Sequence, residues 1–401
     1  MNIRQISQAV VMTGLAATGF AQTSHGGATA PLGPINIGAI STVTAGPADF
    51  ASSGRAAKAV FDSVNATGGI QKRKLVFIQE DDQASPVTAA QAASRLIHGE
   101  KVVAMVGGAS FLECSVNASA YQQAGLASIP ALGLDSICFN TPMIAPVSAG
   151  PYLQFSLALD YVFDKLKKKR LCVMRLGVPG NVQKNMDGVV LAWTQKTGNK
   201  LVLDERDIQP GDKPETYFKK AGEAKCEAIV FGGPENFSIQ FAGAGKKIMP
   251  ANVPLVFQSS VYTSEAAQSL GRDGDGIYAM SEFEPWSSRS GQLSQWRSLM
   301  TAHQVALTSA SQGGYLAAQI LVKAMRGIQG EITRESVTRA LQQLQPYELP
   351  MLSMPFGFGN GAAHHPNQAA IPVQLFEGRW RIAHHEWLKP SIPGAPLVSA
   401  P

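Results

Sequence analysis

Residues 35–83 read INIGAISTVTAGPADFASSGRAAKAVFDSVNATGGIQKRKLVFIQEDDQ. The runs 35–40 and 75–78 are short and apolar, which is typical of buried strands. Residues 50–64, between these runs, carry apolar side chains at helical spacing, and the glycine pair that follows suits the left-handed cap of a helix end. A strand, a helix and a second strand in this order predict a βαβ unit with parallel strands.

The same alternation runs through most of the chain. Further strand-like runs fall at 102–106, 127–129, 171–176, 201–203, 228–231, 255–257 and 277–279. Helical patterns fall near 113–124, 157–168, 183–197, 215–224, 235–247 and 263–270, and three more follow at 291–305, 311–327 and 334–344. The runs 370–376 and 379–382 flank a Glu-Gly turn and predict a hairpin. Two successive series of strands and helices predict an α/β fold with two lobes, each built on a doubly wound parallel sheet.

The first residues have the features of a targeting signal. Arg4 provides a positive charge, residues 9–20 are apolar or small, and small residues stand at 19 and 21 around a cleavage position. The apolar run is shorter than the roughly 20 residues that a membrane span needs. We therefore expect a signal peptide at 1–21, a flexible lead at 22–34, and export to the periplasm.

Export makes the cysteines informative, because disulfides form in oxidising compartments. Cys114 and Cys138 each follow a strand-like run, so both are expected on loops at one sheet edge, and we predict that they pair. Cys172 and Cys226 lie within apolar patterns, and we expect them to be buried free thiols.

Composition and motifs exclude several functions. The chain has 45% hydrophobic and 16% charged residues, which is a globular composition. Its net charge is +5, but the basic residues are scattered rather than interleaved with aromatics, so no nucleic-acid partner is expected. Nucleophile elbows, phosphate loops and zinc motifs do not occur in the sequence, so we expect neither enzymatic activity nor a cofactor.

A metal site is not expected either. Asp273 and Asp275 begin a string like a calcium loop, but Tyr278 stands where that loop requires glycine. The adjacent histidine pairs at 364–365 and 384–385 would point to opposite faces of a strand, so they are interpreted as surface or loop residues.

Five short strings, taken together and in order, resemble one family. Thr44-Ala-Gly-Pro47 is similar to its opening loop, and Asn65-Ala-Thr-Gly-Gly-Ile70 and Glu80-Asp-Asp-Gln83 follow at the family's spacing, with Pro86 and Gly107-Gly108 after them. The chain thus resembles the leucine/isoleucine/valine-binding family, the type I periplasmic solute-binding proteins of ABC importers. This resemblance covers about residues 35 to 388.

The resemblance implies two lobes joined by a hinge of three crossovers, with a ligand in the cleft between them. It implies a first lobe of 35–155 with 284–355, a second lobe of 156–283 with 356–388, and a tail at 389–401. It also implies a periplasmic receptor that delivers a small molecule to a membrane ABC permease, and we expect a monomer. A ligand-sensing receptor of the same fold that signals to a partner protein is the alternative; co-purification with a permease or with a regulatory protein would separate the two.

The ligand should meet loops at the carboxyl ends of parallel strands, where open α/β sheets bind molecules. The candidate ligand-binding residues are Ser110, Phe111, Leu112, Leu132, Gly133, Leu134, Tyr152, Gly233, Glu235, Ser260 and Tyr262. Two assignments stay open. Tyr152 and Phe155 are suited equally to the cleft and to the core, and Glu235 is suited equally to a ligand donor and to the positive end of a helix dipole.

The sequence departs from relatives that take amino acids. Those relatives use a hydroxyl where Leu134 stands and an acid where Ser260 stands. An ammonium group buried without an acidic partner costs several kcal/mol. We therefore expect a less charged ligand or an aromatic acid, packed against Phe111, Leu132 and Leu134.

Overall fold

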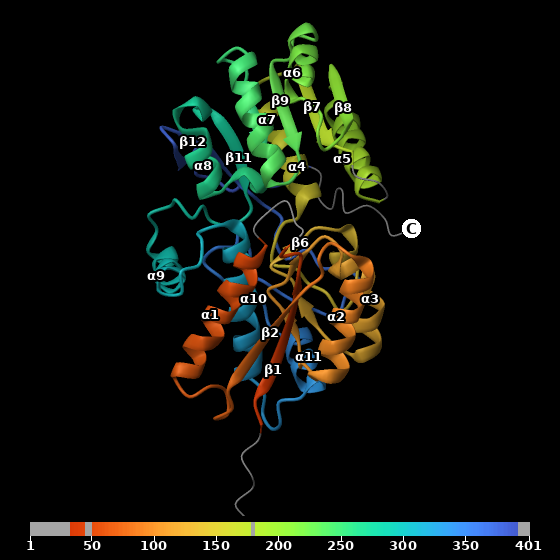
Figure 1. Ribbon diagram of the computed structural model, residues 1–401, viewed down its shortest axis with the longest axis vertical. Coiled ribbons are helices and arrows are strands. Elements are labelled where there is room, and N and C mark those ends of the chain that lie inside the picture. The colour runs from red at the N-terminus through yellow and green to blue at the C-terminus, as the bar shows by residue number, and fades with distance from the viewer. Residues whose placement is uncertain (1–32, 45–49, 178–180, 392–401) are drawn as a thin grey trace, which may run out of the picture. The chain divides into compact units, whose positions relative to one another are not determined.

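Two sheets, one parallel and one mostly parallel, organise the chain from Pro34 onward in the computed structural model (Figure 1). The structure describes residues 33–44, 50–177 and 181–391. The expected signal peptide, nearly all of the expected lead, part of the Thr44 to Pro47 string and most of the expected tail lie outside the described residues.

The first lobe has a four-stranded parallel sheet. Its strands, in spatial order, are β2 (Leu75–Asp81), β1 (Ile35–Ser41), β3 (Met105–Val106) and β5 (Ser128–Ile129). Two short strands, β4 (Ala109–Ser110) and β6 (Leu132–Gly133), pair beside its carboxyl edge. The helices between these strands are α1 (Ala51–Ala66), α2 (Pro86–Ser94) and α3 (Glu113–Ala124).

The second lobe has a seven-stranded sheet. Its order is β13 (Arg379–Ile382), β12 (Ile371–Phe376), β11 (Ile277–Ser281), β10 (Leu255–Phe257), β9 (Ala228–Gly232), β7 (Leu171–Leu176) and β8 (Leu203–Ile208). The helices are α4 (Pro151–Asp160), α5 (Asn181–Thr197), α6 (Pro214–Glu223), α7 (Glu235–Ile248) and α8 (Ser264–Leu270). β12 and β13 form the predicted antiparallel hairpin. The two-lobed α/β fold is thus confirmed. A strand was predicted at 201–203, but β8 starts at Leu203 and continues through polar residues to Ile208, so this prediction was wrong.

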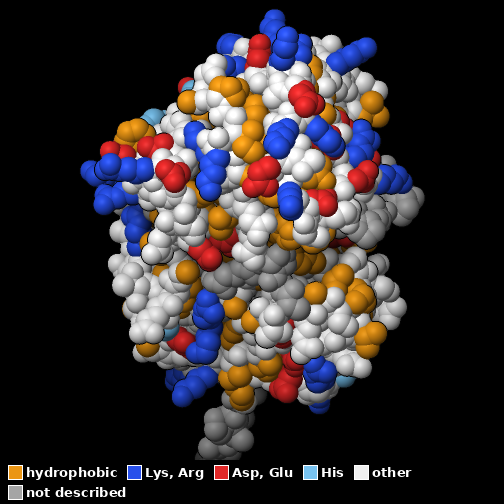
Figure 2. Space-filling view, turned by 45° about the horizontal axis from the view of Figure 1, so that its top comes forward, with side chains coloured by type: hydrophobic (Ala, Val, Ile, Leu, Met, Phe, Trp, Pro, Cys, Tyr) orange, Lys and Arg blue, Asp and Glu red, His pale blue; other side chains and the backbone are white. Residues whose placement is uncertain are grey.

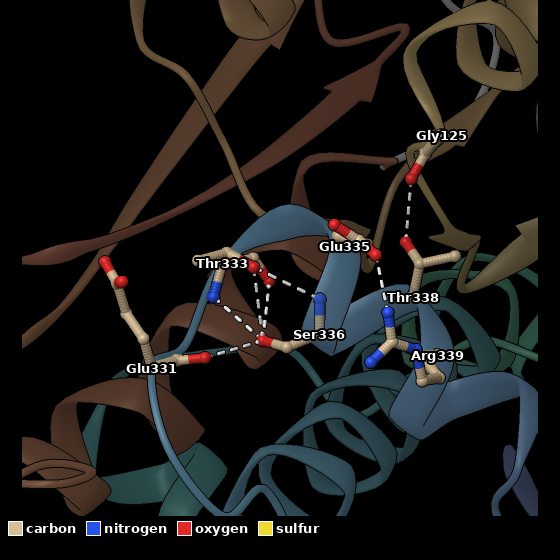
Figure 3. A network of polar contacts seen from close by, with 7 residues as sticks. All are labelled: Gly125, Glu331, Thr333, Glu335, Ser336, Thr338 and Arg339. Atoms are coloured by element: carbon tan, nitrogen blue, oxygen red, sulfur yellow. Dashed lines mark hydrogen bonds and ion pairs between the residues drawn. The ribbon is translucent and has the colours of Figure 1, made fainter.

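The three late helices complete the first lobe. They are α9 (Ser294–Ala302), α10 (Ser309–Arg326) and α11 (Arg334–Gln342). A capping box between Thr333 and Ser336 starts α11. The hydroxyl of Thr338 then donates to the carbonyl of Gly125, 2.8 Å away, which fastens α11 to the end of α3 (Figure 3). A segment more than 200 residues later in the chain therefore covers the first sheet.

Helices α1 and α10 approach closely because Gly314 lacks a side chain. A β-carbon at Gly314 would collide with the backbone carbonyl of Ser53 on α1. We expect Gly314→Ala to lower the free energy of unfolding by about 1–3 kcal/mol, the usual cost of overpacking. Urea unfolding would measure this loss. Gly327→Ala, near the end of α10, is the control, since its nearest new contact is 3.4 Å away. Equal stability of the two variants would contradict the prediction.

The chain passes between the lobes three times. Val147 belongs to the core of the first lobe and Ala149 to that of the second. The chain returns to the core of the first lobe between Met280 and Phe283, and it enters the core of the second lobe again between Phe358 and Ala370. The cores thus change at 147–149 and 358–370, whereas lobe boundaries were expected at 155 and 355, because local patterns do not show which sheet a segment packs against.

Both cysteine pairs form disulfides. Cys114–Cys138 confirms the prediction, with a Cα–Cα distance of 5.2 Å. The expectation of free thiols at Cys172 and Cys226 was wrong, since these residues are also bonded, with a Cα–Cα distance of 5.8 Å. Cys172 lies on β7, and Cys226 lies two residues before β9, which pairs with β7. Sheet order brings the two together across 54 residues of sequence.

His364 lies in a loop, as one of its two interpretations held, but it is buried rather than at the surface. Its Nδ1 donates toward the carbonyl oxygens of Thr141 and Ile144, at 3.1 and 2.8 Å. The ring therefore holds the third crossover against the first lobe.

Candidate ligand-binding site

A cavity of ≈ 750 Å³ lies between the two lobes. Its walls come from loops that follow β4, β6, β7, β9 and β10, with further residues from the crossovers and from the starts of α5 and α10. The ligand site expected at the carboxyl strand ends therefore has a matching cavity. Apolar side chains come to the surface near the junction of the two lobes, whereas charges of both signs are interspersed over the second lobe (Figure 2).

The wall from the first lobe is mainly apolar. Phe111 and Leu112 follow β4, and Leu132, Gly133 and Leu134 form β6 and its end. Phe111 is 37% exposed, and its ring centroid lies 5.1 Å from that of Phe50, which also lines the cavity.

Gly133 is required by packing within this wall. A β-carbon there would come within 2.7 Å of Pro146 and 2.8 Å of Phe139. The Gly133 amide donates to the hydroxyl of Ser148, 2.8 Å away, and is therefore not available to a ligand. Gly133 shapes the wall and lets it approach the first crossover.

Ser110 is not among the residues that line the cavity, and its hydroxyl is engaged within the protein. The hydroxyl oxygen accepts hydrogen bonds from the amides of Leu112 and Glu113, both 2.9 Å away, and the hydroxyl donates to Asp82. These amides at the start of α3 are thus satisfied within the protein. The spacing of Ser110 and Glu113 is that of a capping box, and this signal favoured a structural role.

Tyr152 also lies outside the cavity lining. Both Tyr152 and Phe155 are buried in the core of the second lobe, because α4 packs under the second sheet. Of the two roles that the sequence left open for Tyr152 and Phe155, the structure supports core packing.

The wall from the second lobe contains the other predicted residues. Gly233 and Glu235 follow β9, and Ser260 and Tyr262 follow β10. The Ser260 hydroxyl donates to the carbonyl of Gly233, 2.7 Å away, which ties the two loops together. Tyr262 stacks on Trp286 at 4.8 Å. Glu235 is at once the first residue of α7 and part of the cavity wall, so both of its expected roles have structural support.

Glu282, which the sequence reasoning missed, lies at the hinge and on the cavity wall. Its Oε2 accepts from the Ala149 amide and from Gln154 Nε2, both 2.9 Å away, and Ser259 Oγ is 3.3 Å from Oε1. Burial raises the pKa of Glu282 to about 7, and the surrounding donors oppose this rise. An acid directly after a strand of the second lobe was the available sequence signal.

The third crossover joins the same network. Asn367 donates from Nδ2 to the carbonyl of Glu282, 2.7 Å away, and to that of Val147, 3.4 Å away. Side chains at the hinge thus connect all three crossovers. Any movement between the lobes must be absorbed around this network.

Arg175 begins a loop that was expected to face the ligand, but it was not among the eleven candidate residues. It is the last residue but one of β7 and lines the cavity with a side chain that is 2% exposed. Its Nη1 lies 2.9 Å from Asp187 Oδ1, and its Nη2 lies 2.9 Å from Asp204 Oδ1. Arg206 completes the cluster by pairing with both aspartates. Two guanidinium groups thus balance two carboxylates beside the cavity.

The described ranges contain no group of three or more His, Cys, Asp or Glu side chains placed to share a metal ion. Among the helices in these ranges, none combines the length and apolar character of a membrane span.

Sequence comparison identifies the family. The profile of the family described as "Periplasmic binding protein" matches residues 34–379. The chain belongs to this periplasmic binding protein family. A curated amino acid binding protein from Pseudomonas aeruginosa is 25% identical over 182 residues, which is 45% of this chain. The match spans 48%, about half, of the length of that relative.

Solved structures share the periplasmic binding protein fold. The isoleucine complex of the branched-chain amino acid binding protein LivJ from Streptococcus pneumoniae superposes with a TM-score of 0.76 at 18% identity, over 89% of this chain and 100% of that one. A branched-chain amino acid ABC transporter protein from Thermus thermophilus with bound valine gives 0.79 at 14% identity, over 90% and 98% of the two chains. Identities this low establish the fold alone.

Proposed function

We propose that this protein is an exported binding protein that captures a small organic ligand between its lobes, performs no chemistry on it, and delivers it to a membrane ABC permease. The ligand is an amino acid-like compound or an aromatic or aliphatic carboxylate. The observation that carries the proposal is the interlobe cavity, which strand-end loops of both sheets line and beside which a single network connects all three crossovers.

The mechanism is differential binding. A ligand that contacts both walls stabilises the closed arrangement of the lobes over the open one, by the difference in its affinity for the two. The permease then recognises the closed surface. In this proposal the protein acts in the periplasm as a monomer.

The test begins with small molecules released from the purified protein and identified by mass spectrometry. We expect an unaltered compound with an apolar body to be released, and the same compound to bind again with one site per chain in calorimetry. Crosslinking in membranes is expected to recover an ABC permease. Release of no compound, together with failure to bind amino acids or aromatic and aliphatic acids, would contradict the proposal, as would turnover of the bound compound.

Leu134→Trp tests the location of the site. A larger side chain on the cavity wall is expected to weaken binding by about tenfold or more, since overpacking commonly costs 1–3 kcal/mol. Leu191→Trp is the matched control, because Leu191 is 57% exposed on α5. Equal affinities in the two variants would place the ligand elsewhere.

A further inference from the structure

Most polar side chains on the cavity wall are already satisfied by the protein. Gln154 donates to Glu282 and accepts from the amide of Ser259, 2.6 Å away. Gln258 donates to the carbonyl of Pro151, also 2.6 Å away, and Ser260 donates to that of Gly233. These groups shape the wall, and they offer a ligand little unused hydrogen-bonding capacity.

Four side-chain atoms on the wall differ from this pattern. Arg175 Nε and Nη1, Gln183 Nε2 and Ser309 Oγ are buried and have no hydrogen-bond partner among the described residues, although Nη1 forms an ion pair with Asp187. The nitrogens can only donate, and the hydroxyl can also donate. A buried donor without an acceptor is costly, so the cavity wall lacks an acceptor at these positions.

Arg175 and Gln183 lie at one corner of the second lobe. Gln183 is one helical turn before Asp187 on α5, and residues four apart on a helix are neighbours on its surface. The Asp187 carboxylate is 2.9 Å from Arg175 Nη1. Gln183 and Asp187 therefore share a face of α5, and both Gln183 and Arg175 line the cavity.

The charges at this corner define what can bind there. Arg175 Nη2 donates a hydrogen bond to Asp204, and Asp187 forms an ion pair with Nη1 at 2.9 Å. With Arg206, the cluster is balanced in charge, so it neither demands nor repels a full negative charge. Its unused feature is a pair of N–H donors, which a planar carboxyl or amide oxygen would complete.

We propose that Arg175 Nε and Gln183 Nε2 form a subsite of hydrogen-bond donors that binds the carboxyl or amide oxygen of the ligand. The apolar body then lies toward Phe111, Leu132 and Leu134 of the opposite wall, so the ligand bridges the lobes. This inference rests on the proposed function, and it assigns the polar end of the ligand to the second lobe.

The test uses phenylacetate, phenylacetamide and leucine as probes in calorimetry with the full mature protein. Gln183→Met removes the donor at nearly constant size and is expected to weaken phenylacetate binding by about tenfold or more. Gln183→Glu adds a like charge and is expected to weaken phenylacetate more than phenylacetamide. Gln195→Met is the matched control, because Gln195 is exposed on the same helix, and it should bind like the wild type.

A second readout avoids reliance on a single variant. In ¹⁵N-labelled protein, the Arg175 Nε–H resonance, assigned by its loss in Arg175→Lys, is expected to shift when phenylacetate or phenylacetamide is added. The subsite is disproved if Gln183→Met binds both probes like the wild type, or if neither probe binds or shifts this resonance. If leucine or a released compound still binds unchanged in Gln183→Met, the capture function stands and only the subsite fails.

Discussion

Glu113→Gln is expected to make the protein much less sensitive to alkaline pH. Glu113 is 2% exposed, and its Oε1 accepts a hydrogen bond from the hydroxyl of Tyr121, 3.0 Å away. Burial raises the pKa of Glu113 from 4.5 to about 8, and the nearby charge of Asp82 adds to this rise. Glutamine keeps the carbonyl oxygen that accepts from Tyr121 but has no proton to lose.

The direction follows from the two pKa values. The unfolded chain ionises this carboxyl near 4.5, whereas the folded protein holds the proton until about 8. The stabilisation is therefore complete below the lower value and is lost as the pH rises through the higher one. Between pH 5 and 9, the wild type should lose on the order of 4 kcal/mol of unfolding free energy relative to the variant.

Urea unfolding of both proteins across this pH range measures the difference. Glu282 also has a raised pKa and contributes in the same direction, but it is present in both proteins, so it cancels. Glu265→Gln, at an exposed position, is the control and should follow the wild type. Parallel curves for wild type and Glu113→Gln would show that Glu113 is already ionised at pH 5.

Replacing both Cys172 and Cys226 with alanine is expected to lower the stability of the second lobe by about 4 kcal/mol, because their bond closes a long loop in the unfolded chain. The separation is 54 residues, compared with 24 for Cys114 and Cys138. Replacing the shorter pair should cost slightly less, about 3.5 kcal/mol, and should act on the first lobe.

Hydrogen exchange separates the two effects. Loss of the Cys172–Cys226 bond should accelerate exchange in β7 and β9, while β1 and β2 remain protected. The variant without Cys114 and Cys138 should show the reverse. Free thiols at Cys172 and Cys226 in protein purified from an oxidising compartment, or unchanged exchange in β7, would contradict this prediction.

The sequence determined the local elements and their order. Apolar runs in βαβ order predicted two parallel sheets, and strand-end loops predicted where a cavity forms. Nine of the eleven candidate residues line that cavity, since parallel strands bring their carboxyl ends to one edge regardless of side-chain detail. The Cys114–Cys138 bond was also predicted, although Cys114 lies in the first turn of α3 and Cys138 in a short 3₁₀ turn rather than on loops.

The tertiary structure decided the contacts between distant segments and the direction of each polar group. Local spacing does not encode that β7 and β9 are neighbours, so the Cys172–Cys226 bond was missed. The resemblance placed the Ser110 hydroxyl at the ligand, whereas in the folded chain it accepts from the amides at the start of α3. Arg175 and Glu282 belong to the cavity because strands and crossovers converge there, and such convergence depends on sheet order and burial.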